Sequence, residues 1–251
     1  TRAGTARVVL TDSTGRETET EGEFFSSPEL LKKDLYDFSV EGGVARLDYG
    51  TESFGYADAP LVIGSLRYGI SDVLNAEAHA EASQELVMGG GGLLYNAGNF
   101  GLFTASGAAS LYDGGTGFLA SASWEGNFGD FGLSASTTRT FGDFTDLAAI
   151  TSVPKDGKRT GGVPRAVDQI SFNYNFSELK AGVGLSFIHR LANDGERSLI
   201  VSGGYSQSLP HDISLYATAY ADLGDEKDYG LTLSRSMPLG EQKVPPEQAR
   251  I

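Results

Sequence analysis

The stretch of sequence that decides the fold is LVIGSLRYGISDVLNAEAHAEASQ, residues 61–84. Side chains of a β-strand point alternately to its two faces, and the second half of this stretch alternates between small apolar and polar residues. It therefore predicts a strand with one apolar and one polar face. Ala and Glu favour helices, but a helix would spread the charged residues around the apolar surface, so pattern outweighs propensity. Leu61–Ile70 is the expected partner strand, because only the short ISDV link separates the two. The apolar set is Leu74, Ala76, Ala78, Ala80 and Ala82, and the polar set is Asn75, Glu77, His79, Glu81 and Ser83.

About twelve segments of the chain have this character. Most are near the roughly nine to eleven residues that a tilted strand needs to cross a bilayer, against about five or six in a soluble protein. The links alternate between short and longer, as in outer-membrane barrels, and the longest, Asp143–Arg165, is expected to be a mobile external loop. We predict an all-β fold, an antiparallel up-and-down transmembrane β-barrel that is partial in this chain. The predicted strands lie near Tyr36–Tyr49, Leu61–Tyr68, Leu74–Ser83, Leu86–Tyr95, Phe100–Leu111, Gly117–Glu125, Phe131–Phe141, Val167–Phe176, Ala181–Arg190, Ser198–Gln207, Ile213–Ala221 and Tyr229–Met237.

The two faces of these strands predict where water and lipid lie. A charge turned towards lipid costs up to a few kcal/mol at mid-depth. Glu77, His79 and Glu81 are therefore expected to face a water-filled lumen, together with Ser134 and Ser136, which alternate with apolar neighbours. Aromatic residues near strand ends are expected to form the girdles of a membrane barrel. They are Tyr49, Phe54, Tyr56, Tyr95, Phe100, Tyr112, Trp124, Phe128 and Phe141.

The composition restricts the class of protein. The chain has 251 residues, no cysteine and a formal net charge of −14. A nucleic-acid partner is not expected, because a phosphate footprint needs clustered Lys and Arg. No run of about 18 apolar residues exists, so the sequence predicts no transmembrane helix. A mean hydropathy slightly below zero is compatible with a barrel, in which only every second residue faces lipid.

The ends of the chain differ from its middle. Thr5–Leu10 and Thr18–Phe25 predict a short polar hairpin from a small soluble β-domain, because a lone hairpin is only marginally stable. Pro245 and Pro246 cannot continue a central strand. We expect an incomplete barrel with three parts: residues 1–34 as the end of a preceding domain and a return linker, 35–238 as barrel strands, and 239–251 as a tail or truncated strand.

The residues that could carry chemistry do not form a recognisable site. His79, His189 and His211 lack short metal-ligand spacing, which favours structural or lumen-lining roles. Glu77 and Glu81 would be about 13 Å apart on one strand, too far for a glycosidase pair. No phosphate-binding loop and no set of Ser, His and acidic residues at catalytic spacing occurs. We therefore predict no catalytic residues, no metal and no cofactor.

Residues 11–83 carry a family resemblance. The run TDSTGRETETEGEFFSSPELLKKDLYDFSVEGGVARLDYG, followed by LRYGISDVLNAEAHAEAS, resembles the outer-membrane ushers of the chaperone-usher pathway of pilus (fimbrial) assembly. The likeness is looser from Leu86 to Asp146, and beyond Thr151 only the strand rhythm supports it. The resemblance implies a pore of roughly two dozen strands gated by a plug domain. It makes Phe24, Phe25, Ser26, Ser27 and Pro28 the junction between plug and barrel.

The resemblance also implies partners. They are pilus subunits delivered by a periplasmic chaperone and joined by donor-strand exchange, with outer-membrane lipid around the barrel. Two alternatives remain open: a general porin or autotransporter-type barrel, and a soluble secreted β-rich adhesin. An immunoglobulin-like plug directly before Thr1 would favour the usher over the porin, and solubility as a monomer without detergent would favour the adhesin. An outer-membrane enzyme is the weakest alternative.

Overall fold

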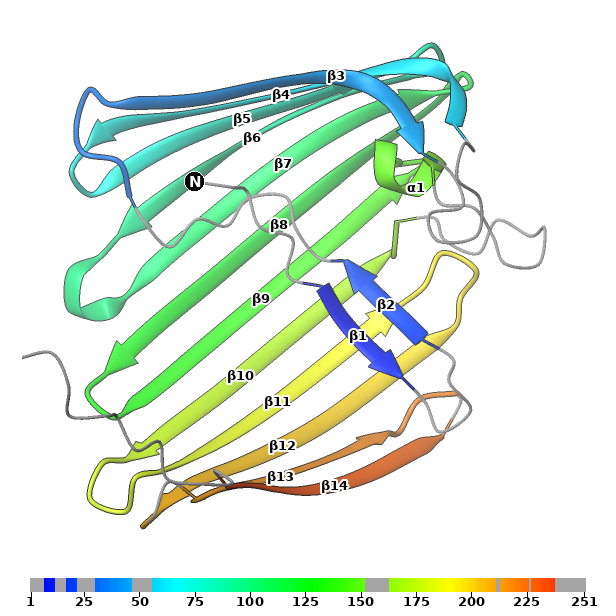
Figure 1. The fold of residues 1–251 in the computed structure, drawn as a ribbon. Coiled ribbons are helices and arrows are strands. Elements are labelled where there is room, and N and C mark those ends of the chain that lie inside the picture. The colour runs from blue at the N-terminus through cyan, green and yellow to red at the C-terminus, as the bar shows by residue number, and fades with distance from the viewer. Residues whose placement is uncertain are drawn as a thin grey trace, which may run out of the picture.

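The structure, a computed structural model, describes residues 7–11, 17–21, 30–46, 56–151, 163–210, 213–225 and 227–237. β1 (Arg7–Thr11) and β2 (Glu17–Glu21) form a two-stranded antiparallel sheet. The other twelve strands form a single sheet in which each strand pairs antiparallel with its neighbours in sequence, from β3 at one edge to β14 at the other (Figure 1). They are β3 (Tyr36–Arg46), β4 (Tyr56–Ser71), β5 (Leu74–Ala82), β6 (Leu86–Asn96), β7 (Leu102–Tyr112), β8 (Gly115–Phe128), β9 (Phe131–Gly142), β10 (Ala166–Phe176), β11 (Ala181–Leu191), β12 (Arg197–Leu209), β13 (Ile213–Asp222) and β14 (Asp228–Ser236).

The structure confirms the predicted antiparallel up-and-down fold and all twelve predicted strands. Most predicted boundaries agree with the structure within two residues, and the larger differences include those at β4 and β8. β4 begins at Tyr56, inside a predicted link, because it pairs with the end of β3 beyond a bulge. β8 continues to Phe128, where a Cβ on Gly126 would lie 2.7 Å from the Phe128 ring and 2.8 Å from the Trp124 ring. Glycine here makes room for two aromatic rings rather than ending the strand.

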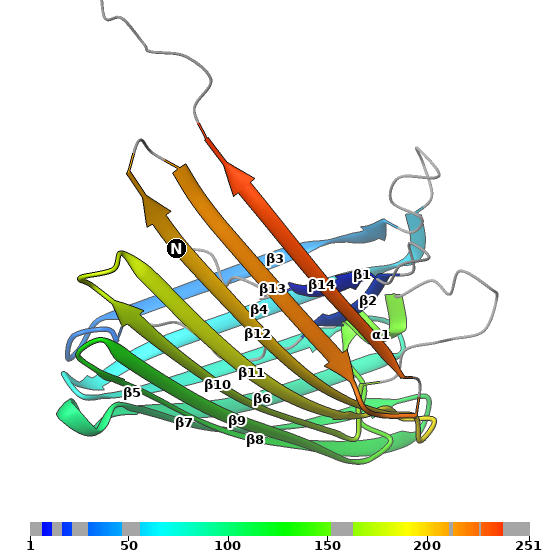
Figure 2. The same ribbon diagram turned by 90° about the horizontal axis from the view of Figure 1, so that it is seen from below.

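The sheet is curved into a trough with a convex and a concave face (Figure 2). The strand register assigns side chains to these faces, since directly paired residues point the same way. On the described part of β3–β14, every exposed large hydrophobic side chain except Tyr216 lies on the convex face. Polar residues predominate on the concave face, so the period-two pattern of the sequence separates the two surfaces as predicted.

One end of the convex face carries a row of touching aromatic rings. Successive ring centroids are 6.5, 6.4, 5.3 and 5.6 Å apart along the row, which crosses β7 to β10. Trp124 and Phe128 belong to it, as the girdle prediction expected. Tyr112 does not, because it packs on the concave face, and Tyr49 and Phe54 lie outside the described residues. The row consists of Phe103, Trp124, Phe128, Phe131 and Phe172.

The concave face is partly covered by the segment that follows β9. This segment contains the short helix α1 (Leu147–Thr151), which lies inside the trough (Figure 2). Phe144 and Leu147 are buried against Leu86, Met88 and Leu119 of the sheet. The prediction of a mobile external loop is therefore wrong for residues 143–151, because their apolar side chains complete a small core. We call this end of the sheet the helix end, and the opposite end, where residues 30–35 lead into β3, the linker end. None of the described helices has the length and apolar character to cross a membrane.

Candidate functional site

The polar side chains of the opening hairpin form a ladder along the concave face of β4 and β5. Direct pairing places Arg67 opposite Glu77 and Ser65 opposite His79. We call the set the polar ladder; it consists of Ser65, Arg67, Asn75, Glu77, His79 and Glu81. Four of its members, Asn75, Glu77, His79 and Glu81, were predicted to share the polar face, and they do. Ser134 and Ser136 also lie on the concave face but on β9, with β6, β7 and β8 between them and the ladder.

Charges in the ladder are paired rather than isolated. Arg67 and Glu77 form an ion pair in which Arg67 Nε lies 2.8 Å from Glu77 Oε1, and the Glu77 side chain is only 5% exposed. The His79 ring contacts Ser65 Oγ through Nδ1 at 2.9 Å and Glu81 Oε1 through Nε2 at 3.0 Å. Burying a carboxylate costs free energy unless a partner compensates it, and the arginine opposite supplies that partner. Arg67 was not predicted as a site residue. Counting back from the turn places it opposite Ala78, and only the register shift between Gly69 and Ser71 brings it opposite Glu77.

At the helix end, the ladder holds the segment that covers the concave face. The backbone N–H of Leu147 donates to Glu81 Oε2 at 2.7 Å, and that of Thr145 donates to Ser110 Oγ at 2.9 Å. Ala149 N–H donates to Asp146 Oδ1 at 2.7 Å, which caps the first turn of α1. A charged acceptor at the start of a helix satisfies an N–H that would otherwise lack a partner.

At the linker end, the ladder meets the segment that enters β3. Asn75 is fully buried and its Nδ2 contacts the carbonyl oxygen of Leu31 at 3.4 Å. The backbone N–H of Asp34 donates a hydrogen bond to the carbonyl oxygen of Gly69 at 2.8 Å, and Lys33 N–H donates to Asp72 Oδ1 at 3.0 Å. The polar ladder thus runs from residues 31–35 at one end of the trough to α1 at the other.

Gly69 is required for this attachment, and replacing it with alanine is expected to release the linker. A Cβ at Gly69 would lie 2.2 Å from the carbonyl oxygen of Lys32. In the full-length protein, we expect trypsin to cleave after Lys32 and Lys33 about tenfold faster in the Gly69→Ala variant, because cleavage follows local opening. Peptide mass spectrometry would measure the rate. Gly64→Ala is the control, since its nearest contact would be an ordinary 3.9 Å; equal rates in both variants would contradict the attachment.

Glu81 is expected to stabilise α1 through its charge. A hydrogen bond to a charged acceptor is worth about 1 kcal/mol more than one to a neutral acceptor. Glu81→Gln should therefore accelerate hydrogen exchange at the Leu147 amide about fivefold, measured by exchange mass spectrometry or NMR. Glu85→Gln removes the same charge from an exposed turn and should leave that amide unchanged. A similar acceleration in both variants would show that net charge, not this contact, is responsible.

Other predicted residues take different positions. His189 lies on the convex face of β11, away from the polar ladder, and His211 is outside the described residues. The predicted junction, Phe24 to Pro28, also lies outside them. Within the described ranges, no three His, Cys, Asp or Glu side chains are grouped so that they could hold a metal ion.

Comparison with known proteins identifies a similar fold. No family model matches the chain, and no curated protein matches its sequence. The chain is similar in structure to the P pilus usher (PapC) translocation pore, with a TM-score of 0.66 and 14% sequence identity, over 93% of this chain and 48% of that chain. It is similar to the E. coli P pilus tip assembly intermediate PapC-PapD-PapK-PapG, with a TM-score of 0.68 and 14% identity, over 94% of this chain and 30% of that chain. The chain spans about half or less of the length of each matched chain, and the likeness shows that it shares the fold of the matched part.

Proposed function

We propose that this chain, which has the fold of an usher translocation pore, is part of an outer-membrane usher that translocates and assembles pilus subunits. The observation that carries the proposal is the separation of faces on a twelve-stranded meander of that fold. A continuous exposed apolar surface is unusual for a soluble protein and fits acyl chains. The polar concave face fits a water-filled channel.

On this proposal, the concave face lines the lumen. Glu77, His79 and Glu81 would then line the wall on β5, and Ser134 and Ser136 the wall on β9. The polar ladder would tie the return linker and α1 to the wall, so that residues 30–35 keep a fixed position when a plug domain moves. Residues 1–34 would be the end of that plug with its linker, 35–238 barrel strands, and 239–251 a tail or a truncated strand.

The proposed partners follow from the usher assignment. They are pilus subunits, a periplasmic chaperone that delivers them, and outer-membrane lipid. Similarity to a pilus tip assembly intermediate supports the pilus subunits and the chaperone. We assign the chain no catalytic step and no cofactor. A single meander with every strand next to its sequence neighbour argues against a sandwich or solenoid adhesin, whose strands pair differently. A general porin is the competing function.

Pilus display and thiol labelling together test the proposal. Deleting the gene should abolish surface pili, and the full-length protein should restore them; loss of small-solute uptake with normal pili would favour a porin. In a full-length protein without other cysteines, Ser134→Cys and Ser136→Cys should react with a membrane-impermeant maleimide in isolated outer membranes. Ala78→Cys and Leu133→Cys should be shielded. Water-accessible labels at residues 78 and 133 would overturn the proposed arrangement of faces.

A further inference from the structure

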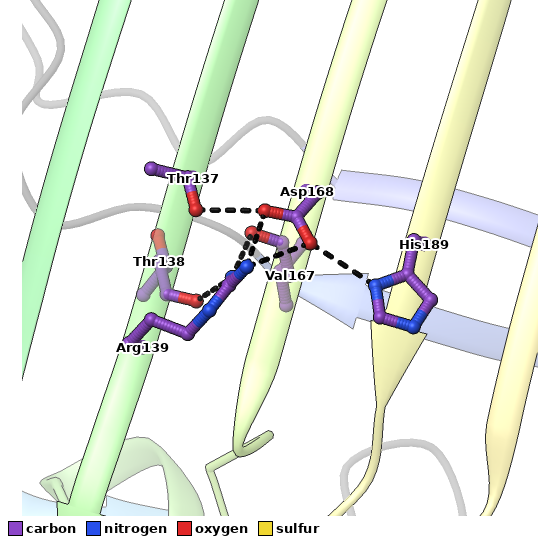
Figure 3. A network of polar contacts seen from close by, with 6 residues as sticks. All are labelled: Thr137, Thr138, Arg139, Val167, Asp168 and His189. Carbon is purple, nitrogen blue, oxygen red and sulfur yellow. Dashed lines mark hydrogen bonds and ion pairs between the residues drawn. The ribbon is translucent and has the colours of Figure 1, made fainter.

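A charged cluster interrupts the apolar convex face near the helix end of the sheet (Figure 3). It consists of Thr137 and Arg139 on β9, Asp168 on β10 and His189 on β11, and we call it the outer cluster. Direct pairing places Asp168 between Thr137 and His189. Arg139 lies opposite Ala120, which belongs to the apolar row of β8. The register therefore puts all four side chains on the face that otherwise carries hydrophobic residues.

The carboxylate of Asp168 organises the other three side chains. Arg139 Nη2 donates to Asp168 Oδ1 at 2.8 Å and to Oδ2 at 2.9 Å. The Thr137 hydroxyl donates to Oδ1 at 2.7 Å, and His189 Nδ1 lies 3.0 Å from Oδ2. Arg139 Nη1 also donates to the backbone oxygen of Thr138 at 2.8 Å. Both oxygens of Asp168 are thus occupied within the cluster, which holds the guanidinium and the imidazole in place (Figure 3).

All three charged or titratable side chains of the cluster are partly exposed, but Asp168, which is 30% exposed, has both oxygens engaged within the cluster. The Arg139 side chain is 41% exposed and that of His189 is 28% exposed. A guanidinium held in a fixed orientation is well suited to bind phosphate, because its N–H groups match two phosphate oxygens. Arg165 lies at the adjacent rim and is exposed, which adds positive charge beside the cluster. The exposed basic groups of the cluster are therefore suited to bind an anion.

The depth of the outer cluster is unusual for charged groups in a membrane wall. Phe131 of the aromatic row and Thr137 are six residues apart on β9, which is roughly 20 Å along the strand and about 15 Å across the membrane at a typical barrel tilt. The apolar band of an outer-membrane barrel is about 25 Å tall. At β9–β11 the cluster therefore lies within the height that hydrocarbon would fill, and a polar headgroup has to reach down to it.

We propose that the outer cluster binds the phosphate of one lipid molecule whose acyl chains lie on the apolar strip below it. Ile170, Leu185 and Phe187 form that strip on β10 and β11 and are 51%, 54% and 36% exposed. The strip is continuous with the cluster, so the surface matches an amphiphile better than a free anion or a hydrophilic peptide. This inference rests on the proposed membrane location of the convex face.

Matched lipids test the proposal on the full-length protein in detergent. Phosphatidic acid and diacylglycerol with the same acyl chains differ only in the phosphate, and native mass spectrometry counts the bound lipid. We expect the wild-type protein to retain one phosphatidic acid and to show no comparable retention of diacylglycerol. The double variant Arg139→Gln/His189→Gln should reduce the retained fraction about tenfold. Arg235→Gln, which removes a charge from the convex face at the linker end, should leave it unchanged.

A second variant separates binding from structural support. Asp168→Asn removes the counter-charge of the cluster while keeping its shape, so it should retain phosphatidic acid at least as well as the wild type. If Asp168→Asn loses the lipid as completely as the double variant, the cluster is only a structural network and the proposal is wrong. The proposal is also wrong if the double variant binds normally, if excess inorganic phosphate displaces the lipid completely, or if the retained mass is a second protein chain.

The two proposals fail in different ways. The labels at residues 78 and 133 report the membrane location without involving the outer cluster. Shielded labels with no difference between phosphatidic acid and diacylglycerol would overturn the lipid site alone. Water-accessible labels would overturn the membrane location and the lipid site with it.

Discussion

Replacing Gly117 with valine is expected to detach residues 143–151 from the concave face. A Cβ at Gly117 would lie 1.9 Å from the backbone nitrogen of Phe144, and no side-chain rotation relieves a clash between backbone and Cβ. Forcing extra atoms into a packed site costs about 1–3 kcal/mol. We expect amide exchange across 144–151 to accelerate about a hundredfold, equivalent to roughly 2.7 kcal/mol, as measured by exchange mass spectrometry on the full-length protein.

The same variant is expected to make the proposed pore leak. Proteoliposomes with the Gly117→Val protein should release a small trapped dye faster than those with the wild type, because part of the lumen cover has moved. Gly89→Val is the control: Gly89 lies on the convex face, and a Cβ added there would meet nothing within 4 Å. If amide exchange at residues 144–151 is unchanged in Gly117→Val, the docking of Phe144 on the concave face does not require a glycine at residue 117.

Placing arginine at Ala78 is expected to destabilise the full-length protein in lipid by roughly 2–4 kcal/mol. Ala78 is exposed at the centre of β5 on the convex face. In the membrane arrangement proposed above, a positive charge there would meet hydrocarbon near the bilayer midplane. Urea unfolding in phosphatidylcholine vesicles, followed by the mobility shift of folded barrels in gels, would measure the change. Ala78→Leu should be neutral or stabilising, because it adds apolar surface that lipid covers.

A concave-face substitution provides the matched charge control. Ser202 lies on the concave face near the middle of β12, so Ser202→Arg adds the same charge to the proposed aqueous lumen. It should change the free energy of unfolding by less than about 0.5 kcal/mol, like an ordinary surface substitution. Equal destabilisation by the two arginines would contradict different environments for the two faces.

The strands and their faces were predictable because each strand repeats one simple period. Long alternating runs such as Leu74–Ser83 determine both the element and its two surfaces without any knowledge of neighbours. The two-residue turn at Asp72 and Val73 predicts the hairpin, but it does not determine the pair of Arg67 and Glu77. The register shifts by one residue between Gly69 and Ser71, and a shift of one residue changes which residues are opposite.

The docked segment and the outer cluster were not predictable in the same way. Phe144 and Leu147 are too few to show a helical period, and only contact with the concave face explains their burial. Arg139 and Asp168 meet because β9 pairs with β10, and the long link over residues 143–165 does not fix that register. Arg139 and Asp168 are too far apart in the sequence for this contact to be predicted. Arg139 did, however, depart visibly from the alternation of β9, because it stands at a position of the apolar face.

The nearest-neighbour order of the twelve strands has a consequence for how the protein folds. Forming a contact costs chain entropy that rises with the length of the loop it closes. Apart from residues 143–165, the links between successive strands of the sheet have only two to nine residues, so the sheet can grow one hairpin at a time. Two such blocks, β3–β9 and β10–β14, can each form independently of the other. Joining them requires closure across residues 143–165, and Phe144 and Leu147 shorten that gap by anchoring its first part to the block already formed. The contacts of this small buried core therefore favour the pairing of β9 with β10, which joins the two blocks.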